Sequence, residues 1–203
     1  SSLLRQQVAL AGEAGWKIVV GRPGRGSRID TAKQRIVLDG QFHGAGTLVY
    51  TLAHEAQHAV ETITRRLALD RSSPEALTDS ALMAEARAQA NAFAVRREIL
   101  DDGGIDIARD ARLPDAIARE ADHVMPGDEA GLRRLAAAFG DVAPSVPGHA
   151  TYRAYYASQA DAMHALGVPR EMPAPTPQPA SNAPVPAATV DAARRQHALD
   201  HLA

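Results

Sequence analysis

The sequence predicts an α+β protein that is mainly helical and has a small N-terminal antiparallel sheet packed on the long helix that follows it. Apolar residues recur at helical spacing through most of the chain after residue 47, whereas residues 16–39 contain short apolar runs separated by loops. Only 4% of the residues are aromatic, so the core must be built from Leu, Ile, Val and Ala, which suits close-packed helices. With 203 residues, the chain can form one domain with a substantial core and a tail.

The N-terminal part contains one helix and the expected strands. A helix is predicted over residues 3–14, because Gly15 is a signal for a helix C-terminus. The Gly-rich residues 21–26 form a loop, and residues 31–34 join the last two strands. The expected strands are 16–20, 27–30 and 35–39.

Helices fill the rest of the predicted domain. The first long helix is expected over 47–69. The second begins at Ser73-Pro74-Glu75, where Ser caps the helix, Pro fits the first turn and Glu favours the positive end of the dipole, and it runs to residue 100. Shorter helices are predicted at 114–124, 128–139 and 151–166.

A change of composition separates a tail from this domain. Residues 168–186 mix Pro, Ala and polar residues, which is typical of an extended linker, and a short helix is expected at 190–202. The predicted organisation is therefore a domain over 1–167 and a Pro-rich linker with a short helix over 168–203, a tail suited to protein contacts. The first residue is Ser1 and not Met, so a trimmed fragment or a processed form is expected.

Composition excludes several classes of function. The net charge of −2 gives no global basic surface for nucleic acid, and no apolar run approaches the roughly 20 residues of a membrane-spanning helix. There is no cysteine, so disulfides and thiolate-bound metals are excluded. Any metal site must be built from His, Asp and Glu.

A pair of histidines provides the beginning of such a site, within the run His54-Glu55-Ala56-Gln57-His58. Residues four apart on a helix differ by about 40° around its axis, so both imidazoles project in the same direction and can share one small cation. Glu55 reaches the same side, where it can accept a proton from metal-bound water. A predicted core face lies roughly opposite the two histidines and consists of Leu48, Leu52, Ala56, Ala59 and Ile63.

A catalytic zinc needs a third protein ligand and an open position for water. The metzincin pattern is excluded, because Glu61 and Thr64 stand where that pattern requires Gly and His. Glu61 also competes as a carboxylate ligand, but it lies a turn beyond His58 on the same helix, where its reach to the metal is poor. Glu75 is the other competing carboxylate.

The second long helix offers Glu85 as the third ligand. Small side chains surround it on the helical wheel and allow the two long helices to approach closely; they belong to Ala81, Ala88 and Ala92. Gln89, one turn further on, can hydrogen-bond a metal-ligating residue without binding the metal itself.

These residues resemble the gluzincin type of zinc metallopeptidase, in which H-E-x-x-H lies on one helix and an E-x-x-A-[DN]-like helix downstream supplies the third ligand. The stretch that contains Gly26-Ser27-Arg28-Ile29-Asp30, Arg35-Ile36-Val37-Leu38 and Leu52-Ala53-His54-Glu55 is similar to metallopeptidase domains of secreted bacterial effectors and toxins. The resemblance covers about residues 26–100. Gln89 departs from the pattern, because the family has an acidic residue at that position.

The resemblance implies a zincin-like domain that uses Zn²⁺ to hydrolyse peptide bonds of a protein substrate. His54, His58 and Glu85 would be the metal ligands, and Glu55 would be the catalytic base. It also implies secretion, with delivery into a target cell as one route, while a cytoplasmic location stays open. Two alternatives also stay open: a hydrolase of cell-wall peptides, and a catalytically silent protein-binding module with a structural metal, which has no need of Glu55.

Two further expectations concern the substrate. An edge strand at residues 35–39 can hold an extended peptide by strand addition. An oxyanion stabiliser is expected from a cluster near the start of the last predicted helix. Its candidates are His149, Tyr152, Tyr155 and Tyr156.

Overall fold

Helices make up most of the structure, a computed structural model that describes residues 1–41, 44–64, 69–111, 113–125, 127–144 and 148–165. The helices in these ranges are α1 (Ser2–Glu13), α2 (Ala45–Ile63), α3 (Pro74–Asp101), α4 (Asp115–His123), α5 (Glu129–Gly140) and α6 (Tyr152–Ala165). The strands are β1 (Lys17–Val20), β2 (Arg28–Asp30) and β3 (Arg35–Leu38), with a short 3₁₀ turn, η1 (Thr31–Lys33), between β2 and β3. The predicted mainly helical α+β class is confirmed.

The small sheet is mixed, so the prediction of an antiparallel sheet is wrong. The strand order is β1-β3-β2, with β2 antiparallel and β1 parallel to β3. Turn η1 reverses the chain, and Gln34 closes the reversal in the left-handed region at φ 48°. Strand β3 therefore runs antiparallel beside β2, and β1 pairs in parallel with the other side of β3.

Strand β3 is the central strand, which corrects the expectation that residues 35–39 form a substrate-binding edge. Both sides of β3 are already hydrogen-bonded, to β1 and to β2. An extended peptide can be added only at a strand with a free side. Strands β1 and β2 are the two edges of this sheet.

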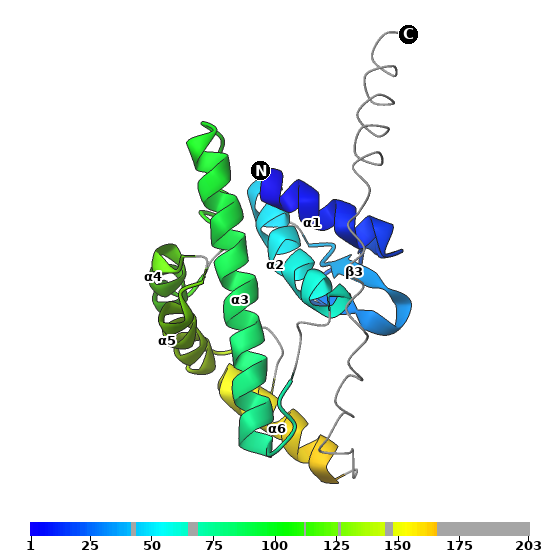
Figure 1. Ribbon diagram of the computed structural model, residues 1–203, viewed down its shortest axis with the longest axis vertical. Helices are drawn as coiled ribbons and strands as arrows, with labels where there is room; N and C mark the ends of the chain where they lie inside the picture. The colour runs from blue at the N-terminus through cyan, green and yellow to red at the C-terminus, as the bar shows by residue number, and fades with distance from the viewer. Residues whose placement is uncertain (42–43, 65–68, 112, 126, 145–147, 166–203) are drawn as a thin grey trace, which may run out of the picture. The chain divides into compact units, whose positions relative to one another are not determined.

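Helix α2 lies between α3 and α1 (Figure 1) and contributes residues to two hydrophobic clusters. Its Tyr50 and Ala53 belong to the cluster that α3, α4 and α5 complete. Its Ala56 and Ala59 belong to a second cluster with α1 and β3. The predicted core face is thus confirmed, and it packs on α1 and the sheet. The opposite side of α2 is also buried, because it packs against α3. It ends at Ile63, before the predicted residue 69.

Helix α3 begins as predicted. The side chain of Ser73 accepts a hydrogen bond from the backbone N–H of Ala76, Pro74 occupies the first turn, and Glu75 is the acidic residue near the N-terminus. The helix runs alongside α2, while α5 and α6 pack against other parts of its surface (Figure 1). This arrangement lets one residue of α3 face α2 and α6 together.

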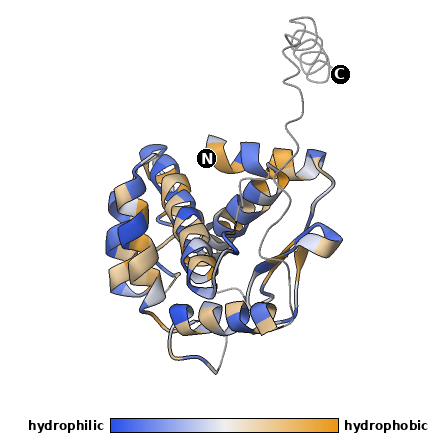
Figure 2. Cartoon of the chain, turned by 60° about the horizontal axis from the view of Figure 1, so that its bottom comes forward, coloured by the Kyte–Doolittle hydropathy of each residue, from blue (hydrophilic) through white to orange (hydrophobic). Residues whose placement is uncertain are grey.

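The remaining helices lie within a residue or two of their predicted ranges. Their residues alternate between hydrophilic and hydrophobic along the ribbon, as expected for amphipathic helices packed on one another (Figure 2). Among the described helices, none combines the length and apolar character needed to cross a membrane. The linker and short helix predicted over 168–203 lie outside the described residues.

Candidate metal centre

Helix α2 brings the two predicted histidines together. The Nε2 atoms of His54 and His58 lie 3.3 Å apart, which the four-residue spacing on one helix allows. Only 16% of the His54 side chain and 12% of the His58 side chain are exposed. The two imidazoles are therefore largely enclosed in the seam between α2 and α3.

Glu85 on α3 completes the group, as predicted. Its Oε2 atom lies 3.2 Å from Nε2 of His54 and 3.7 Å from Nε2 of His58. A tetrahedral zinc with ligand bonds of about 2.0–2.1 Å places its ligand atoms about 3.3 Å apart. The three donor atoms lie 3.2–3.7 Å apart, close enough to share one small cation, and these three residues form a possible metal site.

Small residues allow α2 and α3 to approach closely enough for this contact. Ala88 and Ala92 are fully buried in α3, and so is Ala53 in α2. The side chain of Asn91 donates a hydrogen bond of 2.8 Å from Nδ2 to the backbone carbonyl of Ala53. A side chain of α3 thus reaches the backbone of α2 one residue before His54.

The two histidines shift the pKa of Glu85, and Glu85 in turn shifts the pKa of His58. Burial raises the pKa of Glu85, but the neighbouring His54 and His58 outweigh it and hold this pKa well below the usual range. Burial lowers the pKa of His58, yet the Glu85 carboxylate outweighs that effect and raises it above the ordinary value. Glu85 is therefore ionised, and a proton on His58 competes with a metal.

Glu55 lies beside the group with only 7% of its surface exposed. Burial raises its pKa to about 7; the negative charge of Glu85 adds to the shift, and the positive charges of His54 and Arg28 oppose it. In the described part of the chain, no hydrogen bond holds the Glu55 carboxylate. It is therefore free to exchange a proton with a bound molecule.

Tyr156 on α6 contacts the third ligand. Its hydroxyl donates a hydrogen bond of 2.5 Å to Oε1 of Glu85, leaving Oε2 directed at the histidines. Burial and the negative charge of Glu85 raise the pKa of Tyr156, so the phenol keeps its proton. Of the four candidates for the oxyanion role, Tyr156 thus reaches the group, and there it holds Glu85. No local signal in the sequence distinguishes it from Tyr152 or Tyr155.

The other three candidates make ring contacts. Tyr152 stacks on Tyr156 and packs edge-on against Phe139, while His149 packs edge-on against Tyr155. These contacts shape the surface of α6 around Tyr156.

The competing carboxylates have other roles. Glu61, 2% exposed, accepts hydrogen bonds from Nε of Arg87 at 2.7 Å and from the side chain of Gln57 at 2.9 Å. The four-residue spacing of Gln57 and Glu61 is the sequence signal that predicts their contact. Glu75 lies exposed in the first turn of α3. Neither belongs to the His–His–Glu group.

Gln89 does not support a ligand, so the role predicted for it is wrong. It is buried at 2% exposure, and its Nε2 donates a hydrogen bond to the hydroxyl of Tyr50 in α2. Gln89 lies about one helical turn beyond Glu85 on α3 and faces the turn of α2 that precedes His54. Its hydrogen-bond partner in that turn is Tyr50.

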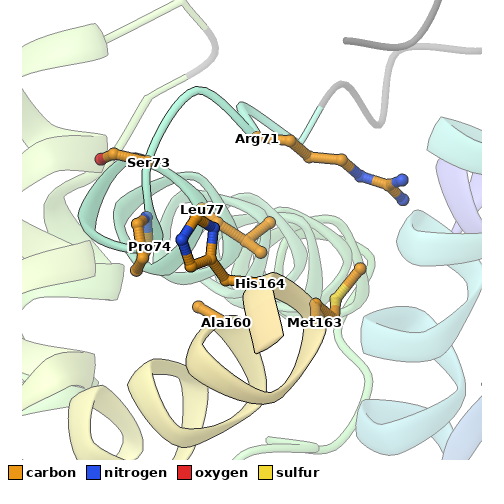
Figure 3. A pocket seen from close by; sticks show the side chains of 7 residues that line it. All are labelled: Arg71, Ser73, Pro74, Leu77, Ala160, Met163 and His164. Carbon is orange, nitrogen blue, oxygen red and sulfur yellow. The ribbon is translucent and has the colours of Figure 1, made fainter. Parts of the chain in front are cut away.

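A small pocket lies away from the metal group, where the start of α3 meets the end of α6 (Figure 3). Its volume of about 20 Å³ is close to the space of a single water molecule. Leu77, Ala160 and Met163 line it, and none of the three predicted ligands does. The pocket is therefore no substrate site.

Comparisons of the chain with protein-family models, with curated proteins and with solved structures found no match.

Proposed function

We propose that this protein is a zinc-dependent metalloendopeptidase with a zincin-like active site. The observation that carries the proposal is the placement of His54, His58 and Glu85 around one point, with the buried carboxylate of Glu55 beside them. Ligands of this kind and number are typical of catalytic zinc sites.

The number of ligands favours catalysis over a structural metal. Structural zinc sites are closed by four protein ligands, whereas catalytic sites keep one position open. Among the described residues, three side chains form the group, and Tyr156 hydrogen-bonds Glu85 from the side away from the histidines. The described residues thus supply three ligands, which leaves a fourth ligand to water or substrate.

The chain's own residues supply proton transfer and orientation. A bound zinc ion supplies a Lewis acid that acidifies water and polarises a carbonyl group. Glu55 accepts the proton of the attacking water and returns it to the leaving amine. Its carboxylate suits this role because burial brings its pKa to about 7 before any cation is bound, and the charge of a cation lowers that value. Tyr156 keeps Glu85 oriented throughout.

The resemblance to effector and toxin metallopeptidases supports a protein substrate and a secreted enzyme that acts in a target cell. We therefore propose an endopeptidase acting on another polypeptide.

Replacement of Glu55 tests the proposal. The zinc-loaded wild type and a Glu55→Gln variant are incubated with a proteome, and newly formed N-termini are identified by mass spectrometry. We expect cleavage by the wild type and at least about a hundredfold less by the variant, which keeps its zinc and its fold because Glu55 is no ligand. A Glu75→Gln variant, changed at an exposed glutamate, should cleave like the wild type. Equal cleavage by wild type and Glu55→Gln would overturn the proposal.

A further inference from the structure

The outward face of the small sheet forms an open groove. Residues paired across strands point to the same face, so Val19, Val37 and Arg28 share one face. The other face carries Ile36 and Leu38, which are buried against α2 and α1. The groove lies on the first face and extends under the loop after β1.

This groove is strongly basic. The residues that line it include five with positive charge and none with negative charge: Arg22, Arg25, Arg28, Lys33 and Arg35. Residues 17–35 hold six basic side chains and one acidic side chain, although the whole chain has a net charge of −2. This segment therefore has a local excess of positive charge, which the net charge of the whole chain does not reveal.

The loop that presents two of the arginines is held in a fixed shape. The carboxylate of Asp39 accepts hydrogen bonds from the backbone N–H groups of Gly24 at 2.8 Å and Gly26 at 2.6 Å. Both glycines have positive φ, which a residue with a side chain rarely adopts. Arg22 and Arg25, on either side of Gly24, are thereby directed to the groove.

Most of these charges have no acidic partner within the described residues. Arg35 is paired with Asp30 at 3.1 Å, and its Nε atom is buried without a hydrogen bond. Arg22 and Arg25 are exposed and form no ion pair in the same ranges. The exposed guanidinium groups of Arg22 and Arg25 are thus available to an acidic ligand.

We propose that this basic groove binds an acidic segment, rich in Asp and Glu, of the polypeptide substrate. The inference rests on the proposed endopeptidase function and adds the substrate class that the enzyme selects. Strand β1 contributes Val19 and Val20 to the lining of the groove, and among the described residues it pairs only with β3. An extended segment can therefore hydrogen-bond along its other side. Strand β2, which carries Arg28, also contacts α2, the helix that holds His54 and His58.

A peptide fits this surface better than a nucleic acid does. Proteins that bind single-stranded nucleic acids combine positive charge with aromatic side chains on which the bases stack. The lining of the groove contains valine, glycine, proline, lysine and arginine, with no aromatic residue. The groove offers positive charge but no aromatic surface on which bases could stack. It therefore suits an extended peptide with carboxylate side chains better than a nucleic acid.

The test is a binding measurement that does not depend on cleavage. A fluorescein-labelled peptide of twelve residues with six Asp or Glu is titrated with the full-chain Glu55→Gln protein, and fluorescence anisotropy is recorded. The reference peptides replace each acidic residue with Asn or Gln, or with Lys. A single-stranded RNA of equal charge is measured in parallel.

Two double variants of the Glu55→Gln protein are compared. One carries Arg22→Gln and Arg25→Gln in the groove, and the other carries Arg119→Gln and Arg133→Gln at exposed positions elsewhere.

We expect the acidic peptide to bind at least about tenfold more tightly than either reference peptide and more tightly than the RNA. The groove variant should weaken this binding about tenfold, because two surface ion pairs with the peptide are lost, and the control variant should leave it within about twofold. Equal binding of acidic and neutral peptides, tighter binding of RNA, or equal weakening by both variants would overturn the inference.

Cleavage is measured separately with the zinc-loaded wild type. Binding of the acidic peptide through Arg22 and Arg25, together with no cleavage of any acidic sequence, would contradict the endopeptidase proposal and leave the groove assignment in place.

Discussion

Glu85 receives opposing contacts at its two oxygens. Oε1 accepts the hydrogen bond of Tyr156, and Oε2 faces His54 and His58. A carboxylate fixed at one oxygen presents the other to a metal in a defined direction, so less freedom is lost when the metal binds. In the proposed metal site, Tyr156 is therefore a positioning residue, which acts through Glu85.

Removal of the Tyr156 hydroxyl should weaken metal binding without unfolding the protein. In Tyr156→Phe we expect zinc affinity to fall about tenfold or more, because groups that orient metal ligands typically contribute 10–100-fold to affinity. The measurement is competition with a chromophoric zinc chelator. Tyr155→Phe is the matched control, since Tyr155 makes ring contacts with His149 and Tyr156. Equal affinities in wild type and Tyr156→Phe would contradict the positioning role.

The raised pKa of His58 predicts how zinc affinity depends on pH. A metal binds the neutral imidazole, so a bound proton competes with it, and the competition extends to higher pH when the pKa is raised. We expect the apparent affinity to be constant above the pKa of His58 and to fall about tenfold per pH unit below it. Titration calorimetry in buffers of different ionisation enthalpy measures the protons released. An affinity that rises as the pH falls would contradict the assignment of His58 as a ligand.

At the scale of elements, a polar network fixes the spacing of α1, α2 and α3. Gln7 of α1 donates hydrogen bonds to Gln57 of α2 at 3.0 Å and to Asn91 of α3 at 2.9 Å. Gln57 in turn donates to Glu61, which is also bound by Arg87. The network runs beside the histidines and joins the same two helices that supply the ligands.

Loss of Arg87 should destabilise this seam. In Arg87→Met, the Gln57 hydrogen bond is the one that the buried Glu61 carboxylate keeps among the described residues. We expect a loss of about 2 kcal/mol in the free energy of unfolding. This is below the 3–5 kcal/mol typical of a fully buried pair, because Arg87 is 31% exposed. Urea unfolding of the metal-free protein measures it. Arg133→Met, at an exposed position of α5, should change stability by less than about 0.5 kcal/mol. Similar losses in both variants would show that the ion pair is unimportant.

At the scale of the whole molecule, the metal group joins elements that are distant in sequence. His54 and His58 come from α2, Glu85 from α3, and the supporting Tyr156 from α6. A ligand that binds only the folded chain stabilises it by an amount set by its concentration and affinity. Binding of a metal at the proposed site would therefore couple to folding of the three helices together.

Zinc should raise the stability of the protein measurably. At a free zinc concentration about a hundredfold above Kd, we expect a gain of about 2.7 kcal/mol, which corresponds to a rise in Tm of about 5–10 °C for a domain of this size. Thermal unfolding followed by circular dichroism checks this. His58→Ala should show almost no zinc-dependent rise, and a rise equal to that of the wild type would mean that zinc binds elsewhere.

The parts of this protein predictable from sequence are those that local spacing determines. The four-residue repeat of His54 and His58 and the cap at Ser73 act over one helical turn. Glu85 was predicted because its small neighbours and its place on the next long helix restrict the choice of partner.

The predictions that were wrong concern features that depend on tertiary packing. Which side of β3 receives β1 is decided by the packing of the whole sheet on α2 and α1, and a short apolar run at 17–20 carries no signal for it. The partners of Gln89 and Tyr156 depend on which turns of α2 and α6 face α3. A single sequence contains no local pattern for such choices.

The most direct test of the central claim is the zinc content of the purified protein after reconstitution, measured by mass spectrometry beside His58→Ala and Glu85→Ala variants. The account predicts one zinc ion per wild-type chain, and little or none in either variant after removal of free metal. A wild-type chain without stoichiometric zinc, or variants that retain as much zinc as the wild type, would contradict it.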